Sequence, residues 1–154
     1  MAEHLIGVIS DTHGLLRPEA LKALTGVELI IHAGDIGNPE ILETLGQIAP
    51  VHAVRGNTDR GAWAAELPHT RIIEVGGVLI YVLHELYALD LDPAAAGLAA
   101  VIFGHSHEPH LERKNGVLYL NPGSAGPRRF VLPVSLARLA IQGTALSPKL
   151  ILFK

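Results

Sequence analysis

Residues 5–14 read Leu-Ile-Gly-Val-Ile-Ser-Asp-Thr-His-Gly, and this stretch indicates how the first half of the chain folds. The apolar run Leu5–Ile9 predicts a short buried strand, and the polar segment with Asp11 and His13 predicts a loop that begins where the strand ends. The pattern returns downstream, where the apolar run Val27–Ala33 leads to Asp35. A strand that ends in potential ligand side chains is therefore a repeating feature of this half of the chain.

Short helices are predicted between these strands. Pro18 with the run Glu19–Leu24 predicts one helix, and Pro39–Ile48, which has apolar residues on one face, predicts a second. Val51–Val54 is a third strand and leads to Asn57. The strand–helix–strand–helix–strand order implies a parallel sheet with right-handed crossovers.

The second half of the chain has the pattern of hairpins and further strands. Gly-Gly at residues 76–77 and Asn-Gly at residues 115–116 are turn sequences that join neighbouring strands. The predicted elements are strands at Arg71–Val75, Val78–Leu83, Ala99–Phe103, His110–Lys114, Val117–Leu120, Val134–Ile141 and Lys149–Phe153, and a short helix at Pro93–Leu98. We expect an α/β fold in which two mixed sheets pack face to face with helices outside, as a single domain over residues 1–154.

Composition narrows the classes of function. The 154 residues contain no cysteine, which excludes disulfides, zinc–thiolate sites, iron–sulfur clusters and cysteine nucleophiles. No signal-peptide pattern or membrane span is apparent, so a soluble cytoplasmic protein is expected. The net charge of −3 argues against a sequence-independent nucleic-acid binder. Nothing in the sequence fixes whether the chain forms a homo-oligomer.

Seven potential metal ligands follow the ends of predicted strands: Asp11, His13, Asp35, Asn57, His84, His105 and His107. In open α/β sheets ligands bind outside the carboxyl ends of the strands. Packing does not explain so many ionisable groups at these positions, because burial without partners is costly. Seven donors exceed one tetrahedral site and suit two divalent ions. Manganese is the first expectation, and iron, zinc, nickel and magnesium are the alternatives.

The charge of such a centre indicates its chemistry. Two divalent ions against two carboxylates leave about two positive charges, which favours an anionic substrate over a neutral peptide. Water bound between two such ions ionises near neutral pH and becomes a nucleophile. The sequence therefore predicts hydrolysis of a small phosphate ester by attack of a metal-bridging hydroxide.

The ordered motifs are similar to those of a known family. Asp-Thr-His at residues 11–13, Gly-Asp at 34–35, Gly-Asn at 56–57, His84 and Gly-His-Ser-His at 104–107 resemble calcineurin-like metallophosphoesterases. Gly-Asn-Thr-Asp at 56–59 and Asn-Pro-Gly-Ser at 121–124 resemble the small bacterial and archaeal phosphodiesterase branch. The resemblance implies a four-layer α/β/β/α sandwich with a dinuclear site at the sheet ends.

The resemblance also implies roles for the ligands. The first metal would be held by Asp11, His13 and His107, and the second by Asn57, His84 and His105. Asp35 would bridge them, with Asp35, Asn57 and His105 nearest the reaction. Two residues depart from the family pattern: Thr58 stands where larger members have a general-acid histidine, and Glu85 stands where glycine is common. Without that acid, diesters and other esters with good leaving groups are the expected substrates.

The sequence also allows other functions, and further residues near the proposed ligands have simpler interpretations. A non-catalytic scaffold is the main alternative function, because a eukaryotic retromer subunit resembles this fold. A metallo-β-lactamase-like site is disfavoured because Pro109 replaces the required aspartate. Arg55 is interpreted as a salt-bridged residue at a strand end, with contact to a phosphate as the alternative. Asp59 is interpreted as a residue that orients Asn57 or the substrate. His32 is a candidate hydrogen-bond partner behind the site, whereas no chemistry is expected of His4, His52, His69 and His110.

Overall fold

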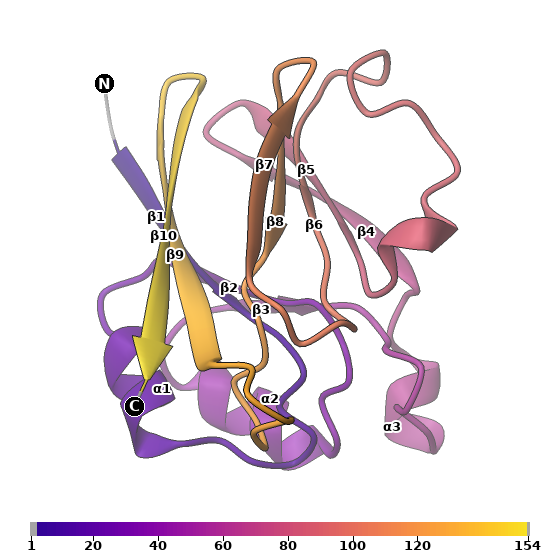
Figure 1. Cartoon of the computed structure of the whole chain (residues 1–154), viewed down its shortest axis with the longest axis vertical. Helices are drawn as coiled ribbons and strands as arrows, with labels where there is room; N and C mark the ends of the chain where they lie inside the picture. Colours follow the sequence, from indigo (N-terminus) through magenta and orange to yellow (C-terminus); the bar gives the residue numbers. More distant parts are fainter. Residues whose placement is uncertain (1–2, 154) are drawn as a thin grey trace.

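The computed structural model describes residues 3–153 and consists of two five-stranded sheets packed against each other (Figure 1). The first sheet has the strand order β10-β9-β1-β2-β3. Its parallel part matches the three strands predicted at the start of the chain, β1 (Glu3–Ile9), β2 (Leu29–His32) and β3 (Val51–Ala53). Two antiparallel strands extend this sheet beyond β1, β9 (Val134–Gln142) and β10 (Ala145–Phe153).

The second sheet has the order β4-β5-β6-β8-β7. Its strands are β4 (Thr70–Val75), β5 (Val78–Leu83), β6 (Leu98–Ile102), β7 (His110–Lys114) and β8 (Val117–Asn121). The central strands β5, β6 and β8 are parallel, and the two predicted hairpins add β4 and β7 at the edges. Asn115 and Gly116 both have positive φ, which is the conformation that the tight turn between β7 and β8 requires.

The main core lies between the two sheets. Side chains two residues apart point to the same face of a strand, and on each inner face they are apolar and fully or almost fully buried. Examples from three strands are Ile6 and Val8, Ile80 and Val82, and Leu118 and Leu120. Burial of each such side chain contributes about 1.5–3 kcal/mol, so this alternation holds the two sheets together.

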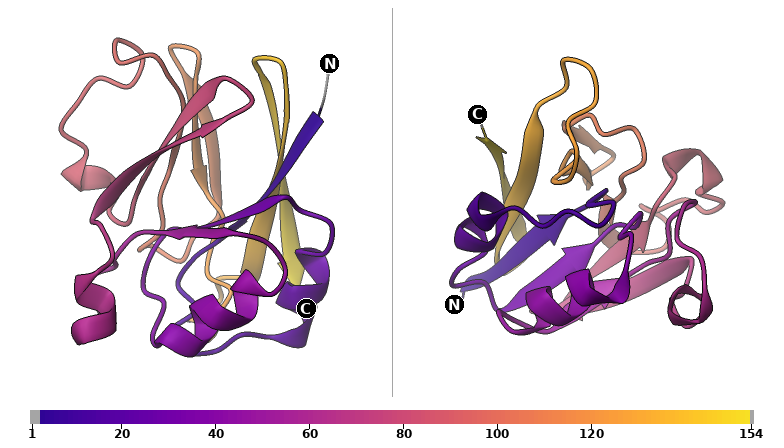
Figure 2. Two further views of the ribbon diagram at one scale, coloured as in Figure 1. Left: turned by 180° about the vertical axis from the view of Figure 1, so that it is seen from behind. Right: turned by 90° about the horizontal axis from the view of Figure 1, so that it is seen from below.

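Helices cover the outer face of the first sheet. α1 (Pro18–Ala23) and α2 (Pro39–Gly46) pack there, with Ile41 and Leu45 of α2 buried in the cluster beneath them (Figure 2). α2 begins where expected because Pro39 occupies its first turn and the Asn38 side chain accepts a hydrogen bond from the Ile41 amide. Within residues 3–153, no helix has the length and apolar character needed to cross a membrane.

The fourth layer is thin. The outer face of the second sheet is covered by the 3₁₀ turn η1 (Leu86–Ala88) and its flanking chain, with Leu86 and Leu89 packed on a small apolar cluster. The α/β/β/α sandwich is therefore confirmed, with one helical layer reduced to a turn. The four-residue helix α3 (Ala62–Ala65) and η1 were not predicted, because neither has an apolar face long enough to show a period.

The predicted helix at Pro93–Leu98 is wrong. These residues form a hydrogen-bonded turn in which the Asp92 carboxylate accepts from the amides of Ala94 and Ala95. The alanines have high helix propensity, but a segment this short recovers little of the cost of starting a helix. Gly97, with φ of 76°, then turns the chain directly into β6.

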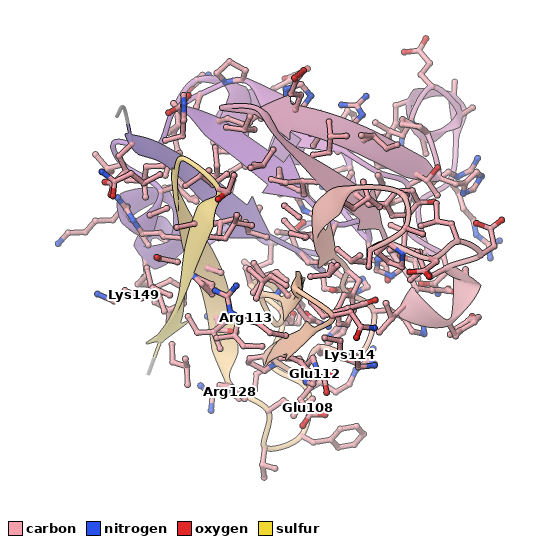
Figure 3. All side chains as sticks on the ribbon, turned by 90° about the horizontal axis from the view of Figure 1, so that it is seen from above. Glu108, Glu112, Arg113, Lys114, Arg128 and Lys149 are labelled. Atoms are coloured by element: carbon pink, nitrogen blue, oxygen red, sulfur yellow. The ribbon has the colours of Figure 1, made fainter. Side chains whose placement is uncertain are left out.

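The edge strand β7 is charged and exposed along its whole length. Glu112, Arg113 and Lys114 are labelled in Figure 3, and Lys114 Nζ lies 3.6 Å from a Glu112 oxygen. The Arg113 guanidinium donates to the Leu146 carbonyl and so links β7 to β10 of the other sheet. Charges on an exposed edge oppose pairing with a strand of another chain, so this edge is protected against aggregation.

Gly56 provides a test of how closely the loops of the first sheet approach each other. A β-carbon at residue 56 would overlap the backbone nitrogen of Asp35, whereas one at Gly46, at the end of α2, would meet nothing. We expect Gly56→Ala to lower the free energy of unfolding by about 1–3 kcal/mol because backbone must shift. Gly46→Ala should raise it by up to about 1 kcal/mol. Urea unfolding of the metal-free protein measures both, and similar effects of the two substitutions would contradict the close approach.

Candidate metal centre

The loops that follow β1, β2, β5 and β6 meet at one edge of the sandwich (Figure 2). Backbone hydrogen bonds tie them together: the Asp11 amide donates to the Gly34 carbonyl, and the His13 amide to the Asp35 carbonyl, over 3.0 and 2.9 Å. The His105 amide donates to Asp11 Oδ2 over 3.1 Å. Residues almost one hundred positions apart are therefore held in register by the backbone.

One group of potential ligands comprises Asp11, His13 and His107, whose ligand atoms all lie within 4.8 Å of one another. The Nε2 atoms of His13 and His107 are 3.3 Å apart, and they lie 3.8 and 3.4 Å from Asp11 Oδ1. Two imidazole nitrogens and a carboxylate oxygen thus point at a common space.

A second group comprises Asp35, His84 and His105, again with ligand atoms within 4.8 Å. His84 Nε2 lies 3.2 Å from Asp35 Oδ2, and Asn57 Oδ1 lies 3.1 Å from His105 Nδ1. Asp35 Oδ2 is also 3.7 Å from His13 Nε2 of the first group, so Asp35 stands between the groups. The structure brings all seven residues proposed from the sequence to one place.

The donors fit cations better than they fit each other. Among the described residues, four buried side-chain atoms have no hydrogen-bond partner, and two of them, Asp11 Oδ1 and His84 Nε2, face each other over 3.9 Å at the centre. Buried polar atoms in native proteins are nearly always paired, so this concentration indicates an absent partner. His84 Nε2 is close to Asp35 but not aligned for a hydrogen bond, which is the arrangement of two ligands around an ion.

The backbone of the site is strained. Seven non-glycine residues of the described chain have positive φ, and five of them are proposed ligands: Asp11, His13, Asp35, His105 and His107, with φ between 46° and 74°. The left-handed conformation costs about 1–2 kcal/mol at a residue with a β-carbon. Such strain persists where surrounding structure imposes it, and it concentrates at functional sites. The site is therefore maintained at the expense of stability.

The pKa values at the centre show how tightly the charges are coupled. Burial by itself raises the pKa of Asp35, but the neighbouring His84 and a hydrogen bond from the Thr58 amide outweigh burial and hold that pKa well below its ordinary value. Burial likewise lowers the pKa of His84, and the carboxylates of Asp35 and Asp11 outweigh it, so the pKa of His84 is raised. The two carboxylates therefore remain ionised and need positive charge nearby.

His32 supports the loop of Asp11 and His13 from behind. Its Nδ1 accepts from the Gly34 amide over 3.1 Å, so its Nε2 carries the proton and donates to Thr12 Oγ1 over 3.0 Å. The Thr12 hydroxyl then donates to the Ile36 carbonyl. Complete burial lowers the pKa of His32 to about 3, so the ring stays neutral and this chain of hydrogen bonds keeps one direction. The candidate role behind the site is supported.

Asp59 holds the loop of Asp35 to the loop of Asn57. Its Oδ1 accepts from the amides of Ile36 and Gly37, and its Oδ2 accepts from the amide of Gly56 over 2.9 Å. The carboxylate is almost fully buried and entirely engaged by backbone. Asp59 therefore positions the loop that carries Asn57, rather than facing a substrate.

Residues 121–124, whose sequence resembles that of the small phosphodiesterase branch, form a further support of the site. Asn121 Nδ2 donates to the Gly104 carbonyl, and Ser124 Oγ donates to the Asp11 carbonyl over 3.0 Å. Ser10, which sequence reasoning did not single out, donates to Asp11 Oδ2 over 2.7 Å. The feature of the sequence that could have identified Ser10 is its position directly before Asp11, where the strand ends.

The remaining histidines and Arg55 lie outside the ligand groups. His4, His52 and His110 face Glu28, Arg71 and Glu112 respectively, away from the ligand set. His69 lines a hollow beside the centre together with Arg55 and Asn57. The expected salt bridge of Arg55 is not found: among residues 3–153 no carboxylate lies within 4.0 Å of its guanidinium.

Comparisons with known proteins show the family and the fold of this chain. Residues 5–144 match the model of the calcineurin-like phosphoesterase superfamily domain. A probable metallophosphoesterase of Methanothermobacter thermautotrophicus is 38% identical, over 96% of this chain and 91% of the relative. A phosphodiesterase of Methanocaldococcus jannaschii is 31% identical, over 77% of this chain and 82% of the relative. Vps29 from Chaetomium thermophilum shares the fold at 20% identity, with a TM-score of 0.85 over 98% of this chain and 88% of that one.

The role of Asp59 can be tested with one isosteric substitution. Asp59→Asn replaces one of two accepting oxygens by an amide group, so at least one of the three backbone donors loses its partner. We expect a loss of about 1–3 kcal/mol in the free energy of unfolding, measured in urea. Asp92→Asn is the matched control, because only Oδ1 of Asp92 accepts, in an exposed turn. Equal stabilities of the two variants would show that Asp59 does not hold the loops.

Proposed function

The chain belongs to the calcineurin-like phosphoesterase superfamily, and from this premise we propose that it is a phosphodiesterase that works with two divalent ions. The observation that carries the proposal is the pair of three-residue ligand groups with Asp35 between them. The first ion would be held by Asp11, His13 and His107, and the second by Asn57, His84 and His105. Asp35 would contact both.

The proposed ligands differ in exposure, and the most exposed ones set the side on which a substrate binds. The side chain of His105 is 41% exposed and Asn57 is also at the surface. That of His13 is 25% exposed, and the remaining ligands, Asp11, Asp35, His84 and His107, are at most 4% exposed. Bound ions would supply positive charge for the phosphate and a water that ionises near neutral pH. Asn57 and His105 lie where they can hydrogen-bond the phosphate oxygens that face solvent.

A preference for diesters and for esters with good leaving groups follows from Thr58. Its amide donates to Asp35 Oδ1 over 2.9 Å, and no imidazole occupies its position to protonate a departing oxygen. A leaving group that departs as a stable anion needs no such proton. Manganese is our first choice of metal. The mixed carboxylate, imidazole and amide set accepts several divalent ions, and availability selects among them.

Substitution of the proposed bridge should disable both metal sites together. Asp35→Asn keeps the size of the side chain, and asparagine tolerates the positive φ of 56° at this residue, so the fold should survive. Its amide cannot serve two cations as a carboxylate does. We therefore expect the variant to lose both bound manganese ions and its kcat/KM to fall at least about 100-fold. Calorimetric titration with manganese and elemental analysis measure the stoichiometry. Asp90→Asn, an exposed carboxylate outside the centre, is the control.

Retention of two tightly bound ions by Asp35→Asn would exclude the bridging role. A His107→Ala variant sharpens the assignment, since it should weaken one ion more than the other. Loss of both ions equally in His107→Ala would contradict the division into two groups.

Substrate preference provides a separate test. With manganese present, we expect bis(4-nitrophenyl) phosphate to be hydrolysed at least about tenfold faster than an alkyl phosphomonoester, because only the former loses a stabilised anion. A strong preference for the monoester would overturn the argument from Thr58. Absence of both bound metal and turnover in the purified protein would instead support the non-catalytic scaffold reading.

A further inference from the structure

Two hollows open beside the second ligand group and share Arg55, Gly56, Asn57 and His69 in their walls. Their volumes are about 270 and 460 Å³. Pockets that bind small molecules measure about 300–1,000 Å³, so there is room for considerably more than one phosphate group next to the metal centre. The larger hollow is the more polar, and its walls include Arg60 and Asp59.

The Arg55 side chain is held by a hydrogen bond but has no carboxylate partner among the described residues. Its Nε donates to the Asp59 carbonyl over 3.1 Å, and this is the single hydrogen bond that the described residues give its side chain. The guanidinium is half-buried, and within residues 3–153 it has no carboxylate at ion-pair distance. A fixed guanidinium with free donors beside a catalytic site is suited to a planar or tetrahedral oxyanion.

The charged residues around the larger hollow are two arginines and one aspartate. Arg55 and Arg60 line it together with His69, and Asp59 has both carboxylate oxygens engaged by backbone amides. The chain as a whole carries a net charge of −3, so this local excess of positive charge is not a consequence of composition. Glu85 lies in the wall of the smaller hollow, so the two hollows differ in the charge of their walls.

We propose that the substrate carries a second phosphate group, which Arg55 binds with Arg60 and His69 while the scissile ester occupies the metal centre. The proposal rests on the proposed function and narrows its substrate class to phosphorylated diesters, such as those of nucleotides. Only Gly56 separates Arg55 from Asn57, so their backbones are at most about 7 Å apart, which places both groups within reach of one small molecule.

The competing explanation is that Arg55 serves only to hold the Asp59 carbonyl. A purely structural Arg55 would affect all substrates alike, whereas a binding residue affects the substrate that carries the second phosphate. Two substrates with the same reacting group separate these cases: thymidine 5′-(4-nitrophenyl phosphate) and its 3′-phosphorylated counterpart. Both release 4-nitrophenol.

The first measurement uses the unaltered, manganese-loaded protein. We expect the 3′-phosphorylated substrate to have a KM about ten- to hundredfold lower than its counterpart, which corresponds to one or two charge-assisted hydrogen bonds. The kcat values should differ much less. Equal KM values for the two substrates would overturn the proposal.

The second measurement uses variants. Arg55→Met should reduce the KM ratio of the two substrates to within about threefold of unity, and Arg55→Lys should restore part of it. Arg71→Met is the matched control, because Arg71 is a half-buried arginine of the same region that contacts His52 outside the two hollows at the centre. Its KM ratio should equal that of the unaltered protein. An unchanged ratio in Arg55→Met would exclude Arg55 as the second anion site.

Failure of the proposed function gives a different result. If the protein hydrolyses neither substrate nor bis(4-nitrophenyl) phosphate, the phosphodiesterase assignment fails. A binding measurement then tests whether the second phosphate site exists. Calorimetry on the unaltered protein with thymidine 3′,5′-bisphosphate and thymidine 5′-phosphate should then show at least about tenfold tighter binding of the bisphosphate, lost in Arg55→Met. Equal affinities would exclude the second phosphate site.

Discussion

The crowding of two carboxylates and four imidazoles within a few ångströms is the constraint on which the rest of this structure depends. Asp11 and Asp35 are both buried, yet their environment keeps their pKa values below the ordinary range. Five of the seven proposed ligands also require a left-handed backbone that side chains disfavour. The backbone conformation would not persist in an isolated loop, and the buried charges need compensating partners, so the surrounding fold must provide both.

The sandwich does so largely through hydrogen bonds that end on backbone. Asp59 joins the loops after β2 and β3, and His32 with Thr12 joins the loops after β1 and β2. Ser124 joins the loop after β1 to the segment that follows β8. Gly56 and Gly104 let these loops approach more closely than any β-carbon would permit. The polar groups that fix the site are therefore fully satisfied, whereas those that face the centre, such as Asp11 Oδ1 and His84 Nε2, are not. Binding of cations would relieve this imbalance.

Much of this could be predicted from sequence, and the remainder has identifiable physical reasons. The strands were predicted from short apolar runs and turn sequences, and the ligands were predicted because each of them comes after the end of a strand. The order β5-β6-β8 in the second sheet could not be predicted, because parallel pairing leaves no turn sequence to read. The role of Asp59 was left open because its partners are backbone amides of residues 36, 37 and 56, which carry no residue-type signal. Arg55 was interpreted as a salt-bridged residue, with contact to a phosphate as the alternative, and the sequence could not decide because it does not show which carboxylates lie near the guanidinium.

Exposure differs among the proposed ligands, and this difference bears on where specificity can change. Asp11 and His107 are buried, and Asp11 is tied by hydrogen bonds to Ser124 and to the His105 amide, whereas His13 of the same group is 25% exposed. His105 is 41% exposed, and Asn57 and His84 line the smaller hollow, beside which Arg55 is held in place without a carboxylate partner among the described residues. In the proposed reaction the buried ligands would fix the geometry, and the exposed side of the centre would leave room for the substrate to vary. Changes of specificity should therefore arise at Arg55 and its neighbours in the hollows, while the buried ligands stay constant.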